Sequence, residues 1–308
     1  MNAVVFWLFV GCPTTAPPAP APAPAPVPVV EPEPEPEPEP VAPPPVDLVV
    51  PSDNAERARR LGELEHQIRD PETPLERLAD LGHAEQRILR VLSTDSVAAK
   101  VVLPLVPEDV RANVQRLLDG TISAGRTVVK PRTDLPNWKI VEPLPPEELL
   151  GYYRASEAAS GVPWSILASV NLNETRMGRL RGTSYVGAQG PMQFMPATWK
   201  AYGKGDPNKD EDAIMAAGHY LNAMGYASNP DRAIWRYNHS DAYVRAIKLF
   251  AESMDEEPRM FHALRGWRVY YRTVEGSIWL RTGYEQTERI SIATYCDDVG
   301  EPYCPKVH

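Results

Sequence analysis

The segment VPWSILASVNLNETRMGRLRGTSYVGAQGPMQFMPATW, residues 162–199, joins an apolar helical pattern to a glycine-rich loop. Helical spacing places four apolar residues on one side of its first half, namely Ile166, Leu167, Val170 and Met177. A carboxylate, Glu174, lies near the end of that half, and a second helix is expected to begin at Pro196, because proline is tolerated in a first helical turn. An acid at the end of a buried helix, facing a loop with Gln, Met and Phe, is typical of a cleft rather than of plain core.

The composition indicates a folded region preceded by a long proline-rich segment. The chain has 308 residues, of which 34 are proline, and about 250 residues remain for one or two cores. The net charge is −9 and no basic stripe stands out, which argues against nucleic acid as a partner. Neither a Cys-x-x-Cys pair nor a histidine cluster occurs, so no zinc site is expected. Cys296 and Cys304 lie eight apart and could form a disulfide in an oxidising compartment.

Residues 1–12, MNAVVFWLFVGC, contain a short uncharged apolar run. The run is too short to span a bilayer, and it is typical of the apolar part of a secretory signal. Apolar residues followed by Gly-Cys resemble a bacterial lipobox. That resemblance implies lipidation of Cys12 after cleavage, and hence a periplasmic protein anchored to the outer membrane. An ordinary cleaved signal or a membrane-inserted stub is the alternative.

Residues 13–51 form a proline-rich segment in which Glu-Pro is repeated five times from Glu31 to Pro40. Proline fixes φ and lacks an N–H donor, so this segment is expected to be a disordered tether with extended polyproline II conformation. It either lifts a folded domain off a membrane or serves as a linker without a spacing role.

Residues 52–135 have the pattern of a helical accessory module. Ser52 or Asp53, and then Thr73, are the expected N-caps of its first two helices. A third helix is predicted over residues 107–120. No residue pattern in this module indicates chemistry.

Residues 143–256 are expected to form about six short helices, each bounded by a cap or by a Gly or Pro signal. Asp212, Asn229 and Ser240 are expected N-caps in this part. In residues 257–308 the period changes: WRVYYRT and IWLRTGY predict a β-hairpin, and RISIATYC predicts a further strand. The fold class is therefore mainly α, with a small β appendage at the C-terminus.

Four motifs, in this order, resemble the lytic murein transglycosylases with a lysozyme-like (SLT) catalytic domain. They are NET at 173–175, GAQGPMQFMPATW at 187–199, DAI at 212–214 and YN at 237–238. The resemblance covers about residues 145–255 and implies a lysozyme-like helical domain there. The Glu-Thr pair looks like the membrane-bound B type of this family.

The resemblance implies that Glu174 acts alone, first as general acid and then as general base. It would protonate the oxygen between N-acetylmuramic acid and N-acetylglucosamine, and the muramoyl C6 hydroxyl would then form a 1,6-anhydro product. Burial favours the protonated acid that this needs. Tyr237 is expected to hydrogen-bond Glu174 or the acetamido group of the substrate. No metal or cofactor is implied, and the implied substrate-binding residues are Met192, Gln193, Phe194, Tyr237 and Asn238.

Two other functions stay open. A muramidase on the same fold would use water in place of the C6 hydroxyl. A non-catalytic peptidoglycan-binding lipoprotein would use the tether and the fold as an anchor, with Glu174 as a surface carboxylate. The expected partners are peptidoglycan glycan strands and, through Cys12, the membrane, with cell-wall machinery proteins as further candidates.

Overall fold

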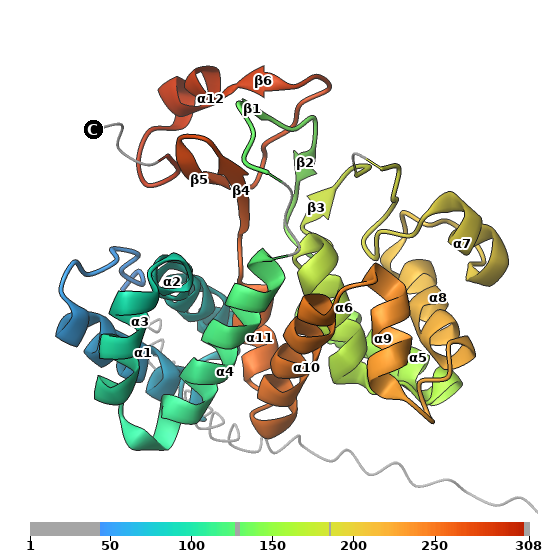
Figure 1. The fold of residues 1–308 in the computed structure, drawn as a ribbon, viewed down its shortest axis with the longest axis horizontal. Helices are drawn as coiled ribbons and strands as arrows, with labels where there is room; N and C mark the ends of the chain where they lie inside the picture. The colour runs from blue at the N-terminus through green and yellow to red at the C-terminus, as the bar shows by residue number, and fades with distance from the viewer. Residues whose placement is uncertain (1–43, 127–129, 185, 305–308) are drawn as a thin grey trace, which may run out of the picture. The chain divides into compact units, whose positions relative to one another are not determined.

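The computed structural model describes residues 44–126, 130–184 and 186–304, shown as a coloured ribbon in Figure 1. These residues form twelve α-helices, one 3-10 helix and six short strands, which confirms the predicted mainly α fold. Cys12 and most of the proline-rich segment lie outside the described residues. No helix of the described part is long and apolar enough to cross a membrane.

The N-terminal helices come first in the chain and together form the left-hand part of Figure 1. Their bounds are α1 Asn54–Arg69, α2 Leu75–Thr94, α3 Ser96–Val102, the 3-10 helix η1 Leu103–Leu105, and α4 Glu108–Gly125. The next group is α5 Pro146–Ser160, α6 Trp164–Thr175, α7 Pro196–Tyr202, α8 Asp210–Ala223, α9 Pro230–Asn238, α10 Asp241–Glu256 and α11 Met260–Arg265. The last helix, α12, spans Ile292–Val299.

Several predicted helix ends are confirmed. The Asp53 side chain accepts from the Glu56 N–H at the start of α1, and the Asn229 and Ser240 side chains cap α9 and α10 in the same way. Helix α7 begins at Pro196 as expected. These ends depend on local capping hydrogen bonds and proline geometry, which a short sequence window contains.

Three predicted helix ends are wrong. Thr73 does not cap α2, because Pro74 is extended (φ −59°, ψ 139°) and is itself the N-cap, without a side-chain hydrogen bond. Asp212 is not an N-cap either, because α8 begins at Asp210 with Lys209 before it. Helix α4 does not stop at Gly120 but continues to Gly125.

The packing of α4 explains why Gly120 lies inside a helix. A Cβ atom at this position would stand 2.7 Å from Cε1 of Phe250, a residue of α10. Glycine therefore lets α4 and α10 approach closely, and this packing offsets its low helix propensity.

One cluster of buried apolar residues extends from Ala58 in α1 to Trp267 after α11, so the N-terminal helices share a core with the helices that follow. Helix α6 lies inside this core and contacts α5, α8 and α10. Most of its residues are buried on all sides, as is typical of a central helix. It ends at Thr175, so Met177, predicted to share its apolar side, lies just beyond it. The segment before α1 also packs on the core, through Val46, Leu48 and Val50.

The C-terminal region has its own smaller core. Strands β4 (Val269–Thr273) and β5 (Gly276–Leu280) form the predicted antiparallel hairpin. The strand predicted over 289–296 is largely wrong: only β6 (Ile290–Ser291) is extended, and α12 follows. The Ser291 side chain accepts from the Thr294 N–H and so caps the start of α12. Periodicity alone predicts a strand for this apolar run, because it does not include the capping hydrogen bond.

Residues between the two helical groups complete this smaller core. Strand β1 (Asp134–Leu135) pairs with β6, and β2 (Lys139–Ile140) pairs with β3 (Leu180–Arg181). Cys296 and Cys304 form a disulfide that joins α12 to the chain after it.

Candidate active site

Glu174 lies in the last turn of α6 and is half-buried. The Tyr243 hydroxyl, from α10, donates a 2.7 Å hydrogen bond to its Oε1 atom. Burial raises the pKa of Glu174 to about 7, while the hydrogen bond from Tyr243 and the charge of Arg176 act in the opposite direction. The side chain can therefore hold or release a proton near neutral pH, as a general acid that becomes a general base must.

The backbone directly after Thr175, the last residue of α6, is left-handed at three successive residues. Arg176, Met177 and Gly178 have φ values of 56°, 55° and 80°. Left-handed non-glycine residues cost roughly 1–3 kcal/mol each and gather at functional sites. Here the turn directs the chain from α6 into the glycine-rich loop, and Glu174 remains at the helix end.

Two buried polar side chains of α6 hold that loop under the helix. Asn171 Nδ2 and Thr175 Oγ1 donate to the Pro191 carbonyl at 2.8 and 2.6 Å. The Tyr153 hydroxyl, from α5, donates to Asn171 Oδ1 at 2.6 Å. Because buried hydrogen-bond partners are costly to remove, this network fixes the loop relative to Glu174.

The loop itself is a tight turn over residues 189–194. Gln189 and Phe194 exchange both backbone hydrogen bonds, each 2.9 Å long. Gly190 has φ 73°, and a Cβ there would stand 1.7 Å from the Pro207 carbonyl oxygen. The Gln193 side chain donates to the carbonyls of Gly190 and Gly182, so it braces the turn.

Met192 and Phe194 are almost fully buried, at 0% and 3% exposed. The Phe194 ring lies 5.8 Å from the Tyr237 ring, and the Met192 carbonyl accepts a 2.8 Å hydrogen bond from the Tyr237 hydroxyl. Both residues therefore support the wall beside Glu174 from within. Asn238 ends α9 and is exposed.

Tyr237 stacks on Tyr243, the tyrosine that donates to Glu174. Their rings are stacked, with centroids 6.2 Å apart and planes 7° apart. Of these two tyrosines, Tyr243 bonds to Glu174 and Tyr237 bonds to Met192. Tyr243 rather than Tyr237 therefore donates to Glu174, and the other expected partner of Tyr237, the acetamido group of the substrate, stays a prediction. Sequence motifs did not single out Tyr243, although its place three residues after the Ser240 cap put it in the first turn of α10.

Three acids of the polar loop and the start of α8 already have partners in the fold. Asp210 forms a 2.6 Å ion pair with Arg181, Asp206 accepts from the Asn208 N–H, and Asp212 accepts from the Asp206 N–H. No group of His, Cys, Asp and Glu in the described part of the chain is arranged to hold a metal ion. Glu174 differs from these acids because its carboxylate accepts from a tyrosine hydroxyl and not from an arginine or a loop N–H.

Comparison with known proteins adds one match. A family model described as "Transglycosylase SLT domain" matches residues 164–231, which include α6, Glu174 and the loop to Phe194 but end before Tyr237. No curated protein and no solved structure matches the chain. The match supports a transglycosylase-type enzyme that acts on peptidoglycan. The segment that holds Glu174 is thus similar to transglycosylase SLT domains.

Proposed function

We propose that this protein is a lytic transglycosylase that cleaves the β-1,4 bond between N-acetylmuramic acid and N-acetylglucosamine, with Glu174 as its one general acid and base. The observation that carries the proposal is the Glu174 carboxyl in the last turn of α6, which accepts from the Tyr243 hydroxyl at 2.7 Å and whose pKa burial raises to about 7. Hydrolytic glycosidases usually need a second carboxylate to activate water or attack the sugar. Of the neighbouring acids, Asp206 and Asp212 accept hydrogen bonds within their own loop, and Asp210 forms an ion pair with Arg181 of β3.

The reaction divides into two proton transfers. Protonated Glu174 gives its proton to the bridging oxygen as the C1–O bond breaks, and the acetamido group of the substrate stabilises the positive charge at C1. The resulting carboxylate then takes the proton of the muramoyl C6 hydroxyl as that oxygen bonds to C1. Glu174 is protonated again at the end, and no water is consumed.

Tyr243 serves the second half of this cycle. Burial and the nearby Glu174 raise the pKa of Tyr243 well above its ordinary value, so its hydroxyl stays protonated and remains a donor. A donor favours the ionised carboxylate and stabilises Glu174 after it has lost its proton. Met192, Gln193, Phe194, Tyr237 and Asn238 shape the sugar-binding wall.

Digestion of purified sacculi followed by mass spectrometry tests the reaction type. Anhydro-muropeptides from the wild type and none from Glu174→Gln are expected. A muramidase would instead give reducing-end products about 18 Da heavier, since water is added. Equal turnover by both proteins would remove Glu174 from the mechanism, and no turnover by either would favour a binding protein.

The proposal extends to location. The lipobox-like end at Cys12 and the proline-rich segment before Val46, the first residue packed on the core, would place the enzyme in the periplasm, held by a lipid at the outer membrane, as in the membrane-bound B type. Incorporation of a labelled fatty acid by the wild type and its loss in Cys12→Ser would support this. Equal labelling of both proteins would contradict it.

A further inference from the structure

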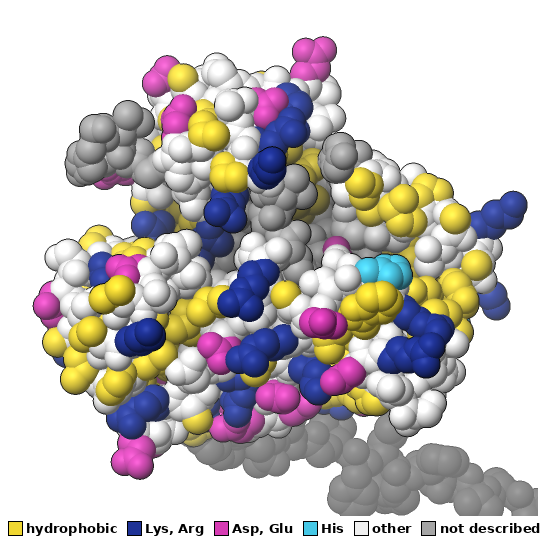
Figure 2. Space-filling model, in the orientation of Figure 1, with side chains coloured by type: hydrophobic (Ala, Val, Ile, Leu, Met, Phe, Trp, Pro, Cys, Tyr) yellow, Lys and Arg dark blue, Asp and Glu magenta, His cyan; other side chains and the backbone are white. Residues whose placement is uncertain are grey.

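A cleft of about 1460 Å³ opens beside Glu174. Its walls come from the segment before α1, from α2, from the end of α4 and from the β4–β5 hairpin. Asn173 and Arg176 also line it, which brings the cleft to the end of α6 that carries Glu174. Figure 2 shows the corresponding hollow between the C-terminal strands and the N-terminal helices, with Lys and Arg side chains along it.

The cleft is strongly cationic although the chain carries a net charge of −9. Among its described lining residues one is acidic, Glu301, and five are arginines: Arg87, Arg90, Arg126, Arg176 and Arg272. We call this set the arginine cleft. Elsewhere in the fold, some buried or half-buried arginines pair with acids, as Arg179 does with Glu142, whereas others donate to backbone carbonyls, as Arg265 does to Leu144. Leaving Glu301 aside, none of the five forms an ion pair with a described carboxylate, although Arg176 donates to the Leu172 carbonyl and its charge interacts with that of Glu174.

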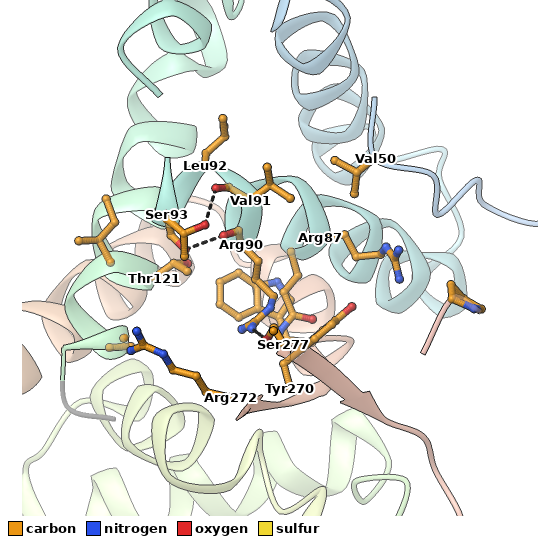
Figure 3. Close-up of a pocket in the computed structure, with 18 of the residues that line it drawn as sticks. Val50, Arg87, Arg90, Val91, Leu92, Ser93, Thr121, Tyr270, Arg272 and Ser277 are labelled. Atoms are coloured by element: carbon orange, nitrogen blue, oxygen red, sulfur yellow. Dashed lines mark hydrogen bonds between the residues drawn. The ribbon is translucent and has the colours of Figure 1, made fainter. Parts of the chain in front are cut away.

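Arg87 and Arg90 lie on one face of α2 and differ in their contacts. The Arg90 guanidinium lies 4.1 Å from the centre of the Tyr270 ring and donates to the Ser277 hydroxyl. Arg87, one turn earlier, has buried Nε and Nη1 atoms without a hydrogen-bond partner among the described residues. Figure 3 shows Arg90 beside Tyr270 and Ser277, with Arg87 and Arg272 around the same cavity.

The arginines also act on each other and on the active site. Burial lowers the pKa of Arg90 to about 10. Burial, and next the charge of Arg90, lower the pKa of Arg176 to about 10, while Glu174 opposes this shift. Unpaired like charges in a partly desolvated cleft are unfavourable, and an anionic ligand would relieve that cost.

We propose that the arginine cleft is a second substrate-binding site, which holds the carboxylates of the peptide stems carried by the glycan strand that Glu174 cleaves. The inference rests on the proposed function and names the part of the substrate that this side of the site receives. Planar guanidinium groups match carboxylates through paired hydrogen bonds, whereas neutral sugars need no such charge. The N-terminal helices, through α2 and α4, thereby contribute one wall of the substrate site.

Calorimetric binding tests the cleft without turnover. The full chain with Glu174→Gln is titrated with a muramyl tetrapeptide and with the same peptide amidated at its carboxyl groups. The peptide with free carboxylates is expected to bind at least roughly tenfold more tightly than the amidated peptide. Arg126→Ala and Arg272→Ala, both at exposed positions, are each expected to weaken its binding roughly fivefold. Arg272→Lys should lose less affinity for the free-carboxylate peptide than Arg272→Ala does. Arg232→Ala, an exposed arginine of α9 outside the cleft, is the matched control.

Equal affinity for the two peptides, or equal losses in Arg272→Ala and Arg232→Ala, would overturn the proposal. Tripolyphosphate binding as tightly as the peptide would also overturn it, since the cleft would then be a general anion site. Turnover is followed separately, as the ratio of kcat/KM on stem-bearing strands to that on stem-free strands. This ratio should exceed one for the wild type and fall in Arg272→Ala. Cleavage of stem-free strands by the wild type tests the proposed function alone. Its absence would contradict the proposed function, whereas an unchanged ratio in Arg272→Ala would contradict only the arginine cleft.

Discussion

The Tyr243 hydroxyl donates a 2.7 Å hydrogen bond to Oε1 of Glu174, although 69 positions separate the two residues in the chain. The bond joins α10 to the end of α6 and opposes the effect of burial on Glu174. The bond therefore limits how far burial raises the pKa of Glu174.

Tyr243→Phe should raise the pKa of Glu174 further, because the lost hydrogen bond favours the ionised carboxylate. The protonated acid then persists to higher pH, so the alkaline limb of the kcat/KM profile should shift upward. kcat should fall roughly tenfold, since a hydrogen bond to a charged group is lost in the second step. Steady-state rates across pH measure both effects.

Tyr152→Phe is the control for this variant, because the Tyr152 hydroxyl donates to the exposed Glu148 carboxylate away from the site. Its profile should match that of the wild type. An unshifted alkaline limb in Tyr243→Phe would show that the hydrogen bond does not tune Glu174.

Glu174→Gln should remove activity and increase stability at alkaline pH. The pKa of Glu174 is raised from 4.5 to about 7 in the folded chain, so the folded state binds this proton more tightly than the unfolded state does. The free energy of unfolding of the wild type therefore falls as pH rises between these values. Gln does not titrate, so the variant should match the wild type near pH 4 and exceed it above pH 7, by up to about 3 kcal/mol.

Urea denaturation at about pH 4 and about pH 8 measures this difference. Glu288→Gln, at an exposed position, should show no such pH-dependent gain. If Glu174→Gln were equally stable relative to the wild type at both pH values, the raised pKa would be wrong.

Gly120→Ala should destabilise the fold by about 1–3 kcal/mol, since the new methyl group would overpack the contact between α4 and α10. The added Cβ would lie 2.7 Å from Phe250. Gly151→Ala is the matched control in α5, where a Cβ meets nothing within 4 Å; it should instead stabilise by about 0.5–1 kcal/mol. Thermal unfolding measures the stability of both variants relative to the wild type. A Gly120→Ala variant more stable than the wild type would contradict the close packing.

Reduction of the Cys296–Cys304 disulfide should lower the free energy of unfolding by about 2 kcal/mol, because the bridge closes a short loop in the unfolded chain. Urea denaturation with and without reductant measures the loss. The Cys12→Ser chain should show the same loss, since Cys12 is not part of the bridge. A reductant effect that persists in Cys296→Ser would have another origin.

The sequence by itself determined the features that depend on neighbours along the chain. The caps at Asp53, Asn229 and Ser240 and the start of α7 at Pro196 follow from local hydrogen bonds and proline geometry. The ordered motifs likewise pointed to Glu174 and its loop, and the family match covers both.

Only the tertiary structure decided the features that depend on residues distant in the chain. Tyr243 reaches Glu174 across 69 positions, and α4 continues through Gly120 because Phe250 packs there. The five arginines come from α2, the end of α4, the residue after α6 and β4, so no basic stripe exists along the chain. Local patterns record backbone preference, whereas the electrostatics of the site arise from side chains that folding brings together.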